Sequence, residues 1–187
     1  MGKLIYSMNV SLDGFVETVD GKIDFQDVDD ELHAWWNDEV RNVDASLYGR
    51  RMYEVMAAYW PTADADPAAT DEMLDFARIW NAKPKIVFST TLETVHWNSR
   101  LATGNVEEEL AKVRTKFDGD LDVSGPTLAS AFIERGLVDE YRLLVHPVIL
   151  GAGKPFFPRL ERPAGLRLRE VRAFGSGVVY LGYSAAA

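Results

Sequence analysis

The sequence predicts an α/β protein built around a mostly parallel, mixed sheet of about eight strands with flanking helices. Short apolar runs alternate with helical patterns through most of the chain, and two alternating segments close it. Alternation of strands and helices favours parallel pairing, because each crossover helix returns the chain to the same end of the sheet. Two alternating segments joined by a glycine-rich turn favour an antiparallel hairpin. We therefore expect a parallel sheet whose C-terminal edge is an antiparallel hairpin.

The strands are expected where short runs are rich in β-branched, aromatic and other apolar residues. The first run is followed by the turn of residues 11–14, and Gly175-Ser176-Gly177 separates the last two runs. Pro147 interrupts the longest run, since proline cannot donate to a ladder. The expected strands are residues 3–10, 45–48, 85–89, 94–97, 121–123, 138–150, 166–174 and 177–184.

The helices are expected where apolar residues recur at helical spacing. In the first helix, Val28, Leu32, Trp35 and Val40 fall on one face, and three acidic residues occupy the first turn. Pro67 with its acidic neighbours is expected to start the third helix. The expected helices are residues 28–43, 49–58, 67–80, 106–117 and 127–135, the last capped by Gly136.

The composition favours a single globular domain over residues 1–187. Hydrophobic residues make up 47% and charged residues 26% of the chain, an ordinary globular balance. The absence of cysteine excludes disulfides, thiolate metal sites and cysteine nucleophiles, and the three histidines have no metal-ligand spacing, so no metal is expected. With no signal-peptide pattern and no apolar run of about 20 residues, we expect no membrane partner and a cytoplasmic location.

The net charge of −9 argues against a nucleic-acid partner, because an acidic chain repels phosphate backbones. A small anionic ligand remains compatible with this charge, since a few local arginines outweigh distant charges at short range.

The clearest candidate for such a ligand site is Gly49-Arg50-Arg51. A strand ends in glycine and a helix begins, so free backbone N–H groups can meet an anion that glycine allows to approach closely. The arginines would add charge-assisted hydrogen bonds. The competing interpretation, two solvated arginines beside acidic neighbours, has about equal weight on the pattern alone.

Two further strand ends carry a weaker signal. Ser124, Gly125, Pro126, Thr127 and Leu128 pass from a buried strand through glycine into a helix, a geometry that can hold a pyrophosphate. The hydroxyls of Ser89 and Thr90 follow the strand 85–88 and could hold a ribose phosphate. Taken singly, the first motif is also typical of a plain strand-to-helix turn and the second of turn caps.

Together these motifs resemble those of a known family. The segments SLDG, LYGRRMYEVMAAYWP, KIVFSTTL and VSGPTLASAFIERGLVDEYRLLVHPVILGAGKPFF are similar to those of bacterial dihydrofolate-reductase-like proteins that share the riboflavin-biosynthesis reductase C-terminal domain. They occur in the family's order and span nearly the whole chain. The resemblance implies a dihydrofolate-reductase-like fold and an NADPH site.

The resemblance also implies roles for individual residues. Asp13 would be the catalytic acid or substrate anchor beside the nicotinamide, with turn capping as the equally weighted alternative. Asp38 or Glu39 on the first helix would be the other candidate acids. Apart from the resemblance, Trp36 and Trp60 are candidates for the walls of the substrate pocket, since ligand sites are mostly apolar, and the alternative is that aromatic residues at helical spacing belong to the core. The implied cofactor-binding residues are Asn9, Ser11, Leu12, Gly14, Gly49, Arg50, Arg51, Ser89, Thr90, Ser124, Gly125, Pro126, Thr127 and Leu128.

The leading hypothesis is an NADPH-dependent reductase that transfers a hydride to a small heterocyclic, pterin- or pyrimidine-like, or carbonyl substrate. The alternative is a non-catalytic nucleotide-binding or regulatory protein on the same fold. We also expect a homodimer built through the C-terminal part of the sheet, because apolar residues are dense from Leu143 onward.

Overall fold

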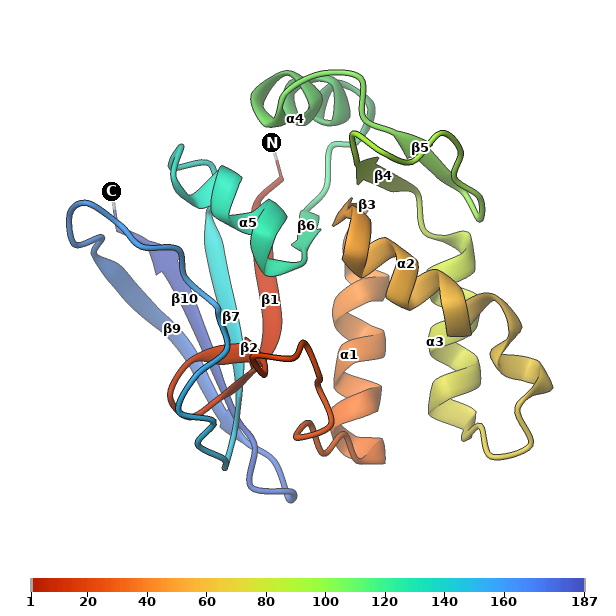
Figure 1. Ribbon diagram of the computed structural model, residues 1–187, viewed down its shortest axis with the longest axis vertical. Helices are drawn as coiled ribbons and strands as arrows, with labels where there is room; N and C mark the ends of the chain where they lie inside the picture. Colours follow the sequence, from red (N-terminus) through yellow and green to blue (C-terminus); the bar gives the residue numbers. More distant parts are fainter. Residues whose placement is uncertain (1, 187) are drawn as a thin grey trace.

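The chain forms one eight-stranded sheet whose strand order is β5-β4-β3-β6-β1-β7-β10-β9 (Figure 1). The computed structural model describes residues 2–186. The strands are β1 (Leu4–Ser11), β3 (Ala45–Gly49), β4 (Lys85–Phe88), β5 (Ser99–Leu101), β6 (Leu121–Ser124), β7 (Glu140–His146), β9 (Leu166–Ala173) and β10 (Val179–Ala185). A separate antiparallel pair joins β2 (Phe15–Glu17) to β8 (Lys154–Pro155).

The pairing confirms the expected mixture of parallel and antiparallel strands. All pairs from β5 to β7 are parallel, whereas β10 pairs antiparallel with both β7 and β9. The chain visits β1, β3, β4 and β5 in one direction and then returns to insert β6 between β3 and β1. Such a reversal leaves a crevice at the carboxyl ends of the strands, where α/β sheets commonly bind ligands.

Helices cover both faces of the central strands (Figure 1). The helices are α1 (Asp30–Asn42), α2 (Arg50–Tyr59), α3 (Asp71–Ala82), α4 (Val106–Lys116) and α5 (Pro126–Ile133), with a 3₁₀ segment, η1 (Trp60–Ala65), after α2. Neighbouring strand residues separate into different cores: Leu47 packs with residues of α4 and α5, and Tyr48 packs with residues of α2 and α3. Among the described residues, no helix is both long and apolar enough to cross a bilayer.

Three sequence-based boundaries differ clearly from the structure. The strand expected over residues 138–150 is β7, which ends at His146, so residues 147–150, which begin with Pro147, form no strand. Residues 94–97 form no strand, because Trp97 has a left-handed φ of 54° and the His96 N–H donates to the Tyr53 hydroxyl instead of to a neighbouring strand. The strand at this edge of the sheet is β5, which begins at Ser99, two residues after Trp97.

The third helix begins at Asp71 and not at Pro67. The Asp66 carboxylate accepts the Ala68 N–H at 2.9 Å and closes a turn around the proline, and Thr70 then caps the helix through the Met73 N–H.

Candidate cofactor and active site

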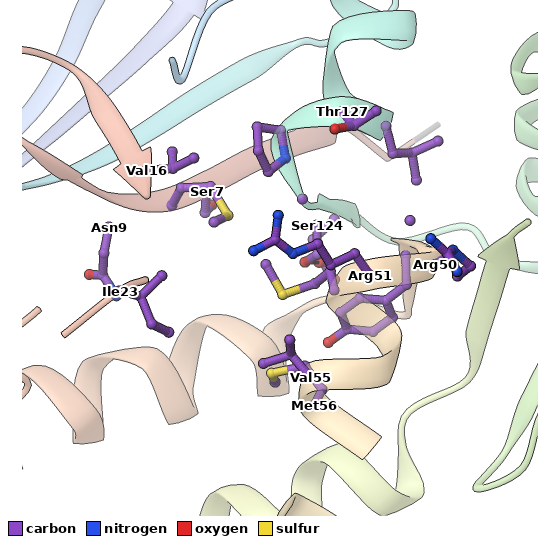
Figure 2. Close-up of a pocket in the computed structure, with 18 of the residues that line it drawn as sticks. Ser7, Asn9, Val16, Ile23, Arg50, Arg51, Val55, Met56, Ser124 and Thr127 are labelled. Carbon is purple, nitrogen blue, oxygen red and sulfur yellow. Dashed lines mark hydrogen bonds between the residues drawn. The ribbon is translucent and has the colours of Figure 1, made fainter. Parts of the chain in front are cut away.

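A cavity of about 1420 Å³ lies between the sheet and helices α1 and α2, at the carboxyl ends of the central strands. Figure 2 shows Ser7 and Asn9 of β1, Ser124 of β6 and the two arginines of α2 around it. The cavity exceeds the roughly 300–1,000 Å³ that is typical of sites for one small molecule. It is therefore large enough for two ligands placed side by side.

The helices that begin at this cavity differ from the others at their N-termini. Helices α1, α3 and α4 are capped by the side chains of Asp29, Thr70 and Asn105. Helices α2 and α5 begin after Gly49 and Gly125, neither of which offers a side-chain cap. Their first N–H groups thus lack the usual side-chain acceptor, and both turns line the cavity. Two such N-termini favour a ligand with negatively charged oxygens.

Gly125 has a conformation that other residues rarely adopt. Its φ is +98°, and a Cβ placed there would lie 3.2 Å from the Cβ of Met52 at the start of α2. Glycine at this point lets the two helix starts approach each other and leaves the backbone open to the cavity.

The two arginines of α2 line the cavity but have different partners. Arg50 is half exposed and lies 3.8 Å from Glu54 on its own helix. Arg51 reaches across to the end of β2 and the loop that follows it, where it contacts a Glu17 carboxylate oxygen and the Gly21 carbonyl oxygen, both at 3.0 Å. Arg50 is thus held by one weak pair, whereas an anion that engages Arg51 competes with Glu17.

Most of the hydroxyl groups predicted to bind the cofactor also line the cavity. Ser89 accepts the N–H groups of Thr91 and Leu92 at 3.1 and 2.9 Å, so it caps a turn while it faces the cavity. Ser124 donates to the Asp122 carboxylate at 2.8 Å. Asn9, Thr90, Thr127, Leu128 and Pro126 complete the predicted residues that the structure brings to this cavity.

The turn of residues 11–14 lies outside the lining of the cavity. Asp13 accepts a hydrogen bond from the Ser11 hydroxyl at 2.7 Å, and from the N–H groups of Leu150 at 3.1 Å and Gly151 at 2.7 Å. The bond from Ser11 and those from the two backbone groups hold the pKa of Asp13 below its ordinary value. This geometry favours the alternative that Asp13 caps the turn and ties it to the loop after β7. The predicted cofactor residues Ser11, Leu12 and Gly14 share its position outside the lining.

Aromatic side chains form the wall opposite the sheet. Trp36 and Trp60 both line the cavity, as predicted for the substrate pocket, and His33 lies edge-on to Trp60 with ring centroids 5.8 Å apart. The indole Nε1 of Trp36 and the Nδ1 of His33 are buried without a hydrogen-bond partner among the described residues. Buried polar atoms of this kind are uncommon and are consistent with a ligand or water in the cavity.

The floor of the cavity contains polar residues that the sequence analysis missed. Asp122, Ser7 and Arg142 project from β6, β1 and β7 into the space beneath α1, and Glu39 of α1 faces them. Burial raises the pKa of Asp122. The hydroxyls of Ser46 and Ser124 donate hydrogen bonds to its carboxylate and act to lower the pKa, but burial outweighs them. Burial likewise lowers the pKa of Arg142.

The structure separates the two carboxylates that the sequence offered on the first helix. Glu39 lines the cavity and pairs with Arg142, and its side chain is only 21% exposed. Asp38 is 71% exposed and pairs with Arg41 on its own helix, away from the cavity. The described residues contain no cluster of histidine and acidic side chains suited to a metal ion.

Comparison with known families agrees with this architecture. Residues 2–180 match the family described as the RibD C-terminal domain. The chain belongs to this family. A relative in Bacillus subtilis (strain 168), the uncharacterized protein YyaP, is 33% identical over 182 residues, which cover 97% of this chain and 94% of YyaP.

Solved structures share the fold at low sequence identity. Dihydrofolate reductase from Enterococcus faecalis, crystallised with NADP(H), superposes with a TM-score of 0.65 at 14% identity, covering all of this chain and 98% of that one. A diaminohydroxyphosphoribosylaminopyrimidine deaminase/5-amino-6-(5-phosphoribosylamino)uracil reductase from Thermotoga maritima gives 0.68 at 16% identity. That match covers 99% of this chain and 57% of the longer protein. The predicted dihydrofolate-reductase-like fold is therefore confirmed.

Proposed function

We propose that this RibD C-terminal domain protein is an NADPH-dependent reductase that transfers a hydride to a small heterocyclic, pterin- or pyrimidine-like, or carbonyl substrate. The observation that carries the proposal is the cavity itself, which joins two uncapped helix N-termini to a polar floor and an aromatic wall. The reductase names of structurally similar proteins, one of which holds NADP(H), agree with it.

The residues at the two helix starts fit the phosphate groups of a dinucleotide. Gly49 and Gly125 permit close approach of the backbone, and Arg50 has a free guanidinium face, because its single ion pair is long. The hydroxyls of Ser89 and Thr90 line the same cavity and would meet the adenosine 2′-phosphate.

The rest of the cavity would hold and orient the substrate. The bound nicotinamide supplies the hydride, and the protein places the acceptor, excludes water and holds the accompanying proton. Trp36 and Trp60 would exclude water from one side. Glu39 and Asp122 are carboxylates that face the cavity, so they are better placed than Asp13 to donate or relay that proton to the hydride acceptor.

The experiment compares NADPH and NADH binding by fluorescence titration. We expect NADPH to bind about tenfold or more tightly, because a hydrogen bond to the charged 2′-phosphate contributes about 1.5–3 kcal/mol. The double variant Arg50→Ala, Arg51→Ala should weaken NADPH much more than NADH. The matched control Arg78→Ala, Arg162→Ala removes two cations from outside the cavity and should change neither affinity.

Turnover is then measured as NADPH consumption with a panel of pterins, pyrimidinones and quinones. Consumption with at least one substrate supports a reductase. Tight NADPH binding without consumption in the whole panel would favour the non-catalytic nucleotide-binding protein. Equal affinity for the two cofactors would contradict the phosphate site.

A further inference from the structure

The floor of the cavity breaks the normal pattern of a sheet covered by helices. Strands buried on both faces are usually apolar throughout. Tyr6 pairs with Val123 and Ser7 pairs with Arg142, so Ser124, Ser7 and Arg142 form a row across β6, β1 and β7. All three line the cavity on the face beneath α1. Polar side chains placed at a cavity wall orient a ligand through hydrogen bonds, so this row favours a polar ligand.

Arg142 is the only cation in this row, and it is held between two carboxylates. Its Nη1 donates to Glu39 of α1, and its Nε and Nη2 both lie 2.7 Å from the same carboxylate oxygen of Glu140. Lys3 pairs with the other oxygen of Glu140 at 2.8 Å. The side chains of Arg142 and Glu39 are only 17% and 21% exposed. Both nevertheless line the cavity, and Glu140 does not.

The pair Arg142–Glu39 therefore presents a donor beside an acceptor with little net charge. A guanidinium has five N–H donors, of which three are used here, and the ionised Glu39 carboxylate has lone pairs to spare. A ligand edge that complements this pair carries an N–H next to a carbonyl. A cationic donor–donor edge fits poorly, because the charge of Glu39 is already balanced by a guanidinium that would repel it.

Building on the proposed function, we propose that Arg142 determines substrate specificity by reading, together with Glu39, a neutral cyclic-amide edge. Arg142 donates to the ring carbonyl and Glu39 accepts from the adjacent ring N–H. The Ser7 hydroxyl lies next to Arg142 in the row, on the side toward Ser124. The subsite thus selects lactam heterocycles over 2,4-diamino heterocycles, whose protonated amidine edge has donors only.

A purely structural role for Arg142 makes a different prediction. Arg172 of β9 and Glu31 of α1 form a second pair between the same helix and the same sheet, at 2.7 Å. These two side chains are 44% and 48% exposed and lie outside the cavity lining. If Arg142 only fastens α1 to the sheet, replacing either arginine should have similar consequences for ligand binding. Arg172→Met is therefore the matched control for Arg142→Met.

The experiment titrates lumazine (2,4-dioxopteridine) and 2,4-diaminopteridine, which share a ring system and differ in this edge, into the protein saturated with NADPH. We expect lumazine to bind at least about tenfold more tightly, since one hydrogen bond to a charged group corresponds to about tenfold or more. Arg142→Met should abolish that ratio, and Arg172→Met should preserve it. NADPH affinity should be unchanged in both variants, which separates the substrate subsite from the phosphate site.

A second variant covers the case in which Arg142→Met does not fold. Glu39→Gln keeps the size of the side chain and replaces the ionised acceptor by an amide, so it should lower the lumazine preference severalfold in a folded protein. Equal affinity of the wild-type protein for the two pteridines, or equal ratios in the Arg142→Met and Arg172→Met variants, would overturn the inference. Failure to bind NADPH would overturn the proposed function only, because the same ligand ratio can be measured on the free protein.

Discussion

Replacing Gly125 with alanine tests both the fold and the cofactor site at one position. The φ of +98° is strained for any residue with a Cβ, and such strain costs on the order of 1–3 kcal/mol. The new Cβ would also lie 3.2 Å from the Cβ of Met52, an atom fixed to the backbone of α2. The starts of α2 and α5 would therefore have to move apart, which disrupts the two N-termini that would bind the phosphates.

The assay is thermal unfolding combined with NADPH titration. For a chain of this length, about 1 kcal/mol corresponds to about 2–4 °C, so Gly125→Ala should lower the Tm by roughly 2–12 °C. It should also weaken NADPH. Gly136→Ala is the control: its φ of +65° lies in the left-handed region, nothing lies within 4 Å, and it is outside the cavity lining. It should lower the Tm alone. Unchanged NADPH affinity in Gly125→Ala would refute the assignment of this turn to the phosphates.

Three further predictions concern a turn, a buried carboxylate and the oligomeric state. If Asp13 caps its turn, Asp13→Asn should leave turnover nearly intact and lower the Tm, because both carboxylate oxygens accept hydrogen bonds and an amide offers only one acceptor. A loss of turnover of about 10²–10⁴-fold with normal NADPH binding would restore it as the acid. For Glu109, burial acts to raise the pKa, but hydrogen bonds from Lys112 and Arg100 outweigh it and hold the pKa at about 2. Its stabilisation should be complete above about pH 4.5 and lost as the pH falls toward 2, so acid titrations of unfolding should show a smaller loss for Glu109→Gln. The edge strand β9 exposes Leu168 and Val171 by 52% and 54%, and light scattering should show a homodimer that Val171→Glu dissociates; a monomeric wild-type protein would contradict this.

The main elements could be predicted because their local patterns agree with their final surroundings. The run 85–89 is β-branched and apolar and becomes the buried strand β4, and the C-terminal alternation becomes the β9–β10 hairpin. The segment 94–97 has the same local character, but it contains Trp97, whose left-handed backbone ends any strand. Tertiary contacts, here the Tyr53 hydroxyl, decided its conformation, and no local pattern contains that contact.

The residues of the candidate site likewise fall into those with a local sequence signal and those that depend on contacts distant in sequence. The glycine turns at the ends of β3 and β6 could be identified, because glycine before a helix is a local signal, and the structure brings both to one cavity. The sequence leaves Asp13 with two equally weighted roles, because the partners that favour turn capping, the N–H groups of Leu150 and Gly151, are distant in sequence. The role of Arg142 could not be predicted, because a single arginine in an apolar strand gives no local signal of a binding site. Its neighbours Ser7 and Glu39 are defined only by the strand register and by the packing of α1 on the sheet.

The two faces of the central strands show where stability and function reside. On the face toward α4 and α5, β1 and β6 contribute Leu4, Tyr6, Leu121 and Val123, which are fully buried. On the opposite face, the intervening residues of the same strands are largely polar and line the cavity. Because strand residues alternate strictly, the two faces could be optimised separately. The apolar face carries most of the packing, so the other face can keep polar groups that are available to a ligand. That asymmetry, more than any single residue, indicates that the space beneath α1 is a binding site and not a packing defect.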